Sequence, residues 1–262
     1  MASFRFILNP LDYTPTATSA DANYPVTNVE DYGHLLRPWK AAVATGIVNV
    51  TLDFGSGNTL SALAADPGIF LDDLNVTSLR IQGNSVTTNW VTPPWDQAIT
   101  VAEDEQVMRY KDFRRLADLN VAAFAYRYLN IRILSQTPTD AAIYRISRAF
   151  VGTILDLTAN PGYDSGVTRR DERIDTKFLD GGIERSLMGE PYVELAWPRR
   201  LPSAAARSEQ HQIEAVLTPF VMWNAGRGGT QDAWMVQRMD DAEMKHTYLN
   251  IYDTHWGFRE VI

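Results

Sequence analysis

The stretch IVNVTLDFGSGN, residues 47–58, is the clearest indicator of the fold in this chain. Apolar and polar residues alternate along it, and in an extended strand this alternation places them on opposite faces. The apolar face consists of Val48, Val50, Leu52 and Phe54. The glycine-rich residues that follow are a turn signal. The stretch therefore predicts an antiparallel strand with one face in a core and the other toward solvent.

The same alternation recurs further along the chain. It predicts further strands at residues 76–84, 126–134 and 142–157, the last with a bulge or break at Gly152. No helical stretch between them is long enough to cross over from one parallel strand to the next, which favours a β-sandwich over a βαβ sheet. We therefore expect a mainly β chain with a sandwich domain over residues 1–157.

The amino-acid composition of the sequence changes after that domain. Residues 158–190 are polar and rich in both signs of charge, so we expect an extended arm or a long loop. Residues 191–262 are expected to form a smaller β-rich or α+β domain. Its one helix is predicted over residues 208–223, with Ser208 as N-cap and an apolar stripe of Ile213, Val216, Leu217 and Phe220. Strands are predicted at 191–197, 232–239 and 246–262.

Composition excludes several classes of protein. The 262 residues carry a net charge of −8 and include no cysteine. Disulfides and thiolate metal sites are therefore excluded, and the chain is expected to fold in a reducing cytosol. The acidic balance argues against nucleic-acid binding. We also expect no signal peptide and no membrane span, since no apolar run approaches about 20 residues.

No set of residues in the sequence suggests catalysis. The four histidines, of which His34 is the first, are scattered, and acidic pairs such as Asp72-Asp73 are expected at charged loop tips. The sequence therefore predicts a protein that is not an enzyme and that uses no cofactor or metal.

Two groups of residues are candidates for binding. Trp90 and Trp95 flank a proline-rich loop, where they could stack on sugar rings, anchor a partner, or cap the end of the sandwich. Arg109 and Arg114 belong to a short basic run, either a contact for an acidic partner or a solvated face. Trp39, in the irregular loop before the first strand, is expected to plug the core beside Val50 and Leu52.

Residues 20–157 resemble the galactose-binding-like (discoidin-type) jelly roll. The matching features are Asn28-Val-Glu-Asp-Tyr-Gly33, then Trp39, then Asp53-Phe-Gly55, and later the strand at 125–133. The threonine of the pattern used by calcium- or sugar-binding members is missing here. The resemblance implies the sandwich fold predicted above.

Some motifs are similar to tail proteins of bacteriophages and phage-like particles. They are Tyr24–Val29, Arg37-Pro-Trp39 and the stretch GGIERSLMGEPYVELAW, residues 181–197. This resemblance implies a structural virion protein of the tail tip or baseplate, made in the host cytoplasm. It would assemble with other tail proteins as a homo-oligomeric ring. The alternative is a carbohydrate-binding module that contacts host-surface glycans through Trp90 and Trp95.

Overall fold

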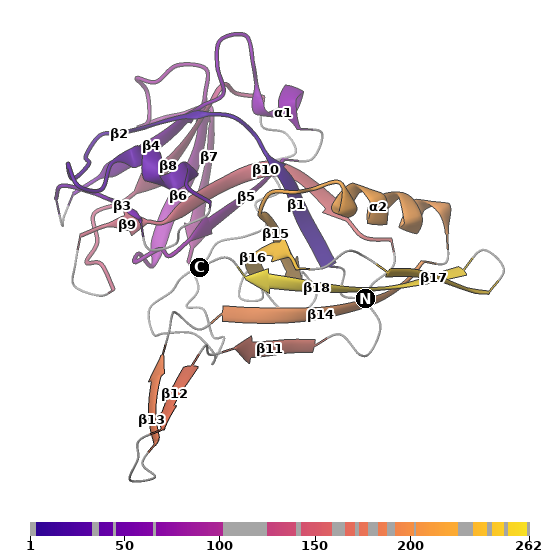
Figure 1. Cartoon of the computed structure of the whole chain (residues 1–262). Helices are drawn as coiled ribbons and strands as arrows, with labels where there is room; N and C mark the ends of the chain where they lie inside the picture. Colours follow the sequence, from indigo (N-terminus) through magenta and orange to yellow (C-terminus); the bar gives the residue numbers. More distant parts are fainter. Residues whose placement is uncertain are drawn as a thin grey trace. The chain divides into compact units, whose positions relative to one another are not determined.

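The structure is a computed structural model with two compact units. The first comprises Met1–Leu157 and Phe220–Trp234, and the second comprises Thr158–Pro219 and Met235–Ile262. The residues it describes are 4–32, 37–43, 46–64, 67–101, 125–139, 143–158, 166–170, 173–177, 183–187, 192–201, 203–224, 233–239, 243–248 and 251–260. Both units are built mainly from antiparallel strands, which confirms the mainly β fold class (Figure 1).

The first unit contains a five-stranded sheet. Its strands, in spatial order, are β2 (Thr14–Ala17), β4 (Val48–Asp53), β8 (Tyr128–Ile133), β6 (Ser78–Asn84) and β7 (Trp95–Thr100). Every neighbouring pair is antiparallel. The predicted strands at 47–58, 76–84 and 126–134 are thus confirmed as β4, β6 and β8.

A second set of strands in this unit lies in the order β15 (Phe220–Asn224), β1 (Phe4–Pro10), β10 (Arg148–Asp156) and β5 (Pro67–Asp72). One core cluster takes buried side chains from both sheets, among them Val50 and Ile131 from the first and Ile69 and Val151 from the second. The two sheets therefore form a β-sandwich, as the alternating strands predict.

Short elements complete the first unit. They are the 3-10 helix η1 (Val26–Glu30), the helix α1 (Leu60–Leu63) and the two-stranded sheet of β3 (Trp39–Lys40) with β9 (Arg145–Ile146). Trp39 pairs with Ile146 and is fully buried in the same cluster as Val50, Leu52 and Phe54. The loop that carries Trp39 therefore contributes a core residue to the sandwich.

The structure has no break at Gly152, where the sequence predicts a bulge or break. Residues 142–157 divide at Ser147, between β9 and β10, and Gly152 is inside β10. The irregularity is in the neighbouring strand, where the register shifts between Leu8 and Pro10 and Asn9 has a φ of 51°. A bulge residue in β1 thus takes the place of a break in β10.

Residues 90–97 are also more regular than predicted. Only residues 90–94 form a loop, because Trp95 begins β7 and lies opposite Gly83 of β6.

The strands of the second unit lie in the order β11 (Gly166–Arg170), β14 (Tyr192–Leu201), β18 (Ile251–Glu260) and β16 (Ala233–Arg238, which enters this unit at Met235), with β17 (Glu243–Tyr248) also paired to β18. The hairpin of β12 (Arg173–Lys177) and β13 (Ile183–Leu187) forms a separate two-stranded sheet. The stretch predicted as an arm or long loop therefore contains three described strands.

The helix of this unit begins and ends earlier than predicted. It is α2, Ala204–Glu214, and its N-cap is Ser203, whose Oγ accepts a hydrogen bond from the Ala206 amide at 3.1 Å. Pro219 disfavours helical geometry at the residue before it. Residues 220–224 instead form β15 and pair with β1, which also explains why they belong to the first unit. Leu217, expected in the apolar stripe, is 80% exposed.

A buried ion pair fastens α2 to the sheet of its unit. Arg199 of β14 is almost fully buried and pairs with Glu209 of α2. None of the described helices is long and apolar enough to cross a membrane.

Candidate functional site

The outer face of the five-stranded sheet is polar across its three central strands. Alternation turns Val50 of β4 and Ile131 of β8 toward the core, so their neighbours in sequence point the other way. Strand pairing arranges these outward residues in three rows. The rows are Asn49–Arg132–Arg80, Thr51–Asn130–Gln82 and Asp53–Tyr128–Asn84. We call these nine residues the polar face.

The middle row is a closed hydrogen-bond network. The side-chain nitrogen of Asn130 donates to Gln82 Oε1 and to Asn49 Oδ1, both at 3.0 Å. Its oxygen accepts from Thr51 Oγ1 at 3.1 Å. Asn130 and Gln82 are buried, so the network holds the orientation of these side chains and of Asn49, which is half-buried.

One outer row contains a clamped carboxylate. Asp53 accepts from Arg127 Nε at 2.6 Å and from Arg127 Nη2 at 2.7 Å, and Oδ1 also accepts from the Gly55 amide at 2.8 Å. The hydrogen bonds from Arg127 lower the pKa of Asp53 from its ordinary value. The Arg127 guanidinium also lies 4.7 Å from the centroid of the Tyr128 ring. The Asp-Phe-Gly motif thus ends β4 in a tight turn and an ion pair.

The other outer row holds two guanidinium groups side by side. Arg80 and Arg132 are directly opposite on β6 and β8. Arg80 makes a bidentate pair with Asp96 of β7, with Nε–Oδ1 at 2.8 Å and Nη2–Oδ2 at 2.7 Å. Arg132 donates from Nη1 to the main-chain oxygen of Trp90. Within the described part of the chain, no carboxylate forms an ion pair with Arg132, so this row carries an excess positive charge.

The position of Trp90 and Trp95 around a proline-rich loop suggests rings that are displayed to solvent. The structure places both rings differently. The Trp90 side chain is only 9% exposed, and its loop is tied to the polar face through Arg132 and through Asn84 Nδ2, which donates to the Asn89 oxygen at 3.0 Å. Trp95 is partly buried and packs against the core cluster. The rings therefore support the loop and the sheet edge and offer little area for stacking. Arg109, Arg114 and His34 lie outside the described residues.

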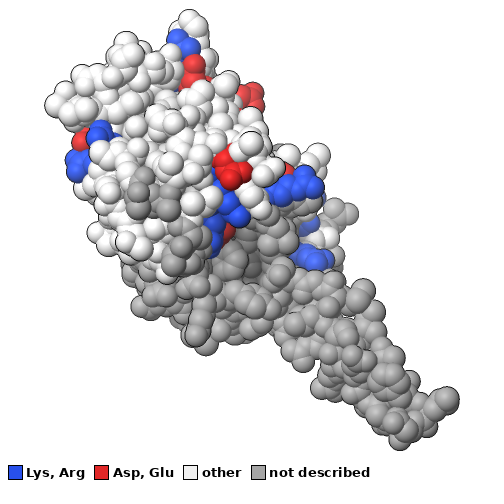
Figure 2. Space-filling view, turned by 90° about the vertical axis from the view of Figure 1, so that its left-hand side faces the viewer, with Lys and Arg blue, Asp and Glu red and all other residues white. Residues whose placement is uncertain are grey.

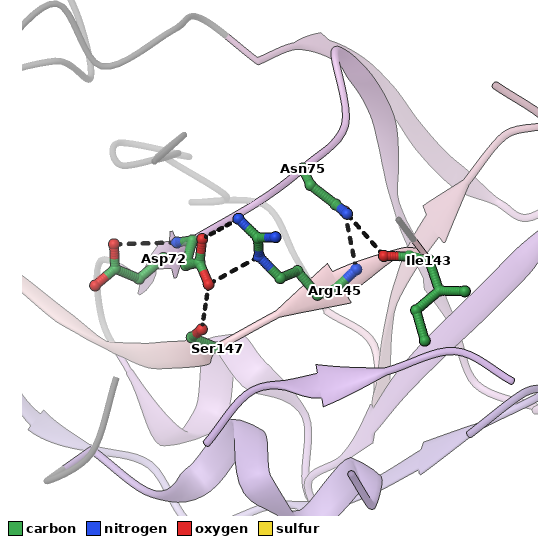
Figure 3. Close-up of polar contacts among 6 residues, drawn as sticks. Asp72, Asn75, Ile143, Arg145 and Ser147 are labelled. Atoms are coloured by element: carbon green, nitrogen blue, oxygen red, sulfur yellow. Dashed lines mark hydrogen bonds and ion pairs between the residues drawn. The ribbon is translucent and has the colours of Figure 1, made fainter. Parts of the chain in front are cut away.

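The acidic pair expected at a loop tip, Asp72-Asp73, is buried instead. Figure 3 shows the polar contacts around it. Asp73 accepts from Arg145 Nε at 3.0 Å, from Arg145 Nη2 at 2.9 Å and from Ser147 Oγ at 2.8 Å. Asn75 Nδ2 donates to the Ile143 oxygen at 2.7 Å, and Asn75 Oδ1 accepts from the Arg145 amide at 2.9 Å. Burial raises the pKa of Asp73 against the opposing effect of Arg145. These residues join the segment after β5 to β9, which is a structural role.

In the parts of the chain that the structure describes, no group of three or more His, Cys, Asp or Glu side chains is placed to hold a metal ion. The carboxylates named above are engaged by arginine side chains, which is consistent with that finding.

Sequence reasoning missed the polar face. Alternation already places Asn49, Asn130 and Arg132 outward, and that was the available signal. What it lacked was register: only the pairing of β6 with β8 shows that Arg80 lies opposite Arg132, and that Gln82 lies opposite Asn130.

Comparison with known proteins gives only distant similarities. No family model matches the chain, and no curated protein matches it. Among solved structures, a GH29 fucosidase from Ruminococcus gnavus has 9% identity to this chain and a TM-score of 0.36. The match covers 54% of this chain and 25% of the fucosidase. Chitosan-binding module 1 of a chitosanase/glucanase from Paenibacillus sp. IK-5 has 19% identity and a TM-score of 0.36, covering 54% of this chain and 96% of the module. Similarity at this level does not identify a ligand.

Proposed function

We propose that this chain binds glycans through the polar face and does not act on them as an enzyme. The observation that carries the proposal is the three-row arrangement on β4, β8 and β6. The buried middle row fixes the geometry, and the half-buried Asn49, Arg80, Tyr128 and Arg132 stand at the outer rows. Planar amides and guanidinium groups held in place are suited to the hydroxyl groups of a sugar, and an aromatic ring is suited to its apolar face.

Binding without catalysis is supported by the state of the carboxylates. Asp53 is clamped by Arg127 through two hydrogen bonds, and Asp96 is clamped by Arg80 through three. Glycoside hydrolysis needs one carboxyl group that gives up a proton and a second that acts as nucleophile or base. The hydrogen bonds from Arg127 lower the pKa of Asp53, which makes this carboxylate poorly suited to the acid role.

The distribution of charge also supports recognition by hydrogen bonds. On the face drawn in Figure 2, the described charged residues occur in small groups of mixed sign, with uncharged residues between them. A ligand that depends on a broad positive field, such as a nucleic acid, would gain little from such a surface.

A glycan array with the full-length chain, followed by calorimetry on the best ligand, tests the proposal. Tyr128→Ala and Asn49→Ala should each weaken binding at least fivefold, because each removes a side chain from an outer row of the polar face. Ser61→Ala, at an exposed position on α1, should leave the affinity unchanged. An array without any glycan signal, or equal affinity in all three variants, would contradict the proposal.

The hairpin of β12 and β13 supports a second proposal, a structural role in a bacteriophage tail tip or baseplate. Its described strands pair only with each other. A two-stranded hairpin is marginally stable by itself in water and gains stability by packing against another surface, such as a neighbouring subunit in a ring. The two proposals are compatible, since a virion protein located in the tail can also contact glycans on the host surface.

Light scattering and native mass spectrometry on the purified chain test the assembly role. We expect a closed homo-oligomer, alone or after addition of other tail proteins. A chain that stays monomeric in both conditions would argue against a place in the tail.

A further inference from the structure

We propose that the polar face selects acidic glycans, and that Arg132 receives the carboxylate of a uronic-acid or sialic-acid type of sugar. The inference rests on the proposed glycan-binding function and deepens it by naming the class of ligand. It comes from the outer row Asn49–Arg132–Arg80, where the three residues lie side by side on β4, β8 and β6.

The two arginines of this row are in different electrostatic situations. Arg80 has its charge compensated by the bidentate contact with Asp96. Arg132 uses Nη1 to hold the Trp90 oxygen, and its Nε is buried without a hydrogen-bond partner. No described carboxylate is paired with Arg132. A guanidinium group has five N–H donors, so this half-buried side chain retains donors and a full charge for an incoming anion.

Asn49 extends the same donor surface. Its Oδ1 accepts from Asn130 Nδ2 at 3.0 Å, so the side-chain oxygen is already engaged by a residue of the middle row. The Nδ2 group of Asn49 is therefore the part of the amide left to contact a ligand. Asn49 is directly opposite Arg132 in the register of β4 and β8. The pair offers N–H donors from two neighbouring strands, which is complementary to a carboxylate, an acceptor with two oxygens.

The surroundings favour a sugar with one carboxylate per ring over the closely spaced charges of a polyphosphate. Asp96 lies beside Arg80, Asp53 lies at the other outer row, and the whole chain has a net charge of −8. A polyphosphate would meet these carboxylates along with Arg132. A sugar whose carboxylate faces Arg132 and whose hydroxyl groups lie over the rest of the polar face avoids that repulsion. A sulfate ester shares the same anion chemistry, and the test must separate it from a carboxylate.

The test uses matched polysaccharides with the full-length chain. Polygalacturonate and its methyl ester differ only at the carboxyl group, which is an anion in the first and a neutral methyl ester in the second, and dextran sulfate and dextran form the second pair. We expect the chain to bind polygalacturonate at least tenfold more tightly than the ester. The preference should fall with added salt, because it depends on one guanidinium–carboxylate contact. Dextran sulfate should bind more weakly than polygalacturonate.

Variants locate the contact. Arg132→Gln should remove the preference for the acid form while residual binding to the methyl ester persists, and Arg132→Lys should retain part of the preference. Arg37→Gln, at an exposed position outside the polar face, is the matched control and should preserve the preference. Thermal unfolding of each variant establishes that the sheet is intact, since Arg132 also holds the Trp90 loop.

The outcomes separate the two levels of the proposal. Equal affinity of the natural chain for acid and ester would overturn the inference and leave glycan binding standing. Binding of dextran sulfate in preference to polygalacturonate would overturn the carboxylate assignment. Failure to bind any glycan on an array would overturn both.

Discussion

Gly152 of β10 and Gly68 of β5 are direct partners across the sheet, and neighbouring isoleucines fill the space that their missing side chains leave. A Cβ at Gly152 would lie 2.7 Å from Ile7 Cγ2 and 2.9 Å from the Asn9 oxygen. A Cβ at Gly68 would lie 2.6 Å from Ile154 Cγ1. The close approach of β1, β10 and β5 thus depends on two residues without side chains.

Gly152→Ala should destabilise the first unit by about 1–3 kcal/mol, because the added methyl group meets main chain as well as side chain. Chemical unfolding followed by circular dichroism measures the change. Thr153→Ala, at the exposed neighbouring position, serves as control and should have a small effect. Equal stability of Gly152→Ala and the natural chain would show that β1 shifts to accommodate the methyl group.

Trp39→Ala should cost about 3–5 kcal/mol of unfolding free energy, as expected for loss of a large buried side chain. Trp39 is 0% exposed and lies in the core cluster with Val50 and Leu52. Thermal and denaturant unfolding measure the loss. Val43→Ala, at a position that is 47% exposed, should change stability by less than about 0.5 kcal/mol. Similar small losses in both variants would contradict the role of Trp39 in the core.

Trp90→Ala should lower the stability of the first unit, and this loss should be larger than any direct loss of ligand affinity. The ring is 9% exposed and belongs to the loop that Arg132 and Asn84 tie to the sheet. Melting temperatures of Trp90→Ala and of Val91→Ala, whose side chain is 79% exposed, provide the comparison. A Trp90→Ala chain with unchanged melting temperature and lost glycan binding would instead identify Trp90 as a stacking residue.

The ion pair of Asp53 and Arg127 should make stability depend on pH in the acid range. Arg127 lowers the pKa of Asp53 in the folded state, so the ionised form contributes stability above the unfolded pKa of about 3.9. That contribution is lost as the pH falls through the lower folded pKa. Unfolding curves at several pH values should show Asp53→Asn less stable than the natural chain at pH 7. The difference should shrink as the pH falls through the lowered pKa of Asp53 in the folded state; a difference that does not shrink in acid would contradict the assignment.

Ser203→Ala should destabilise the second unit by about 1 kcal/mol, because it removes the side-chain cap of α2. Ser208→Ala lies within the helix at an exposed position and should be nearly neutral. Unfolding curves of the two variants decide between the cap in the structure and the cap that the sequence suggests. A larger loss of stability in Ser208→Ala than in Ser203→Ala would contradict Ser203 as the N-cap of α2.

The length of that helix illustrates a limit of local patterns. Residues 213–220 carry apolar side chains at helical spacing, yet Phe220 belongs to β15. The pairing of β15 with β1 joins segments from distant parts of the chain, and the hydrogen bonds gained there outweigh a local preference. In the same way, the local sequence around Asp72 and Asp73 predicts solvent-exposed acids. In the structure, Arg145 and Ser147, which are far away in sequence, bind the Asp73 carboxylate.

By itself, the sequence determined the two-sided character of the strands. The alternation in residues 47–58 and 126–134 was enough to place Val50, Leu52 and Ile131 in a core and Asn49 and Arg132 outside it, because side-chain direction in a strand is a local, two-residue period. Only the tertiary structure decided which outward residues meet. The register of β6 against β8 places Arg80 beside Arg132 and Gln82 beside Asn130. A slip of one residue would separate both pairs. Register depends on how the two faces of the whole sandwich pack, which no single stretch of sequence encodes.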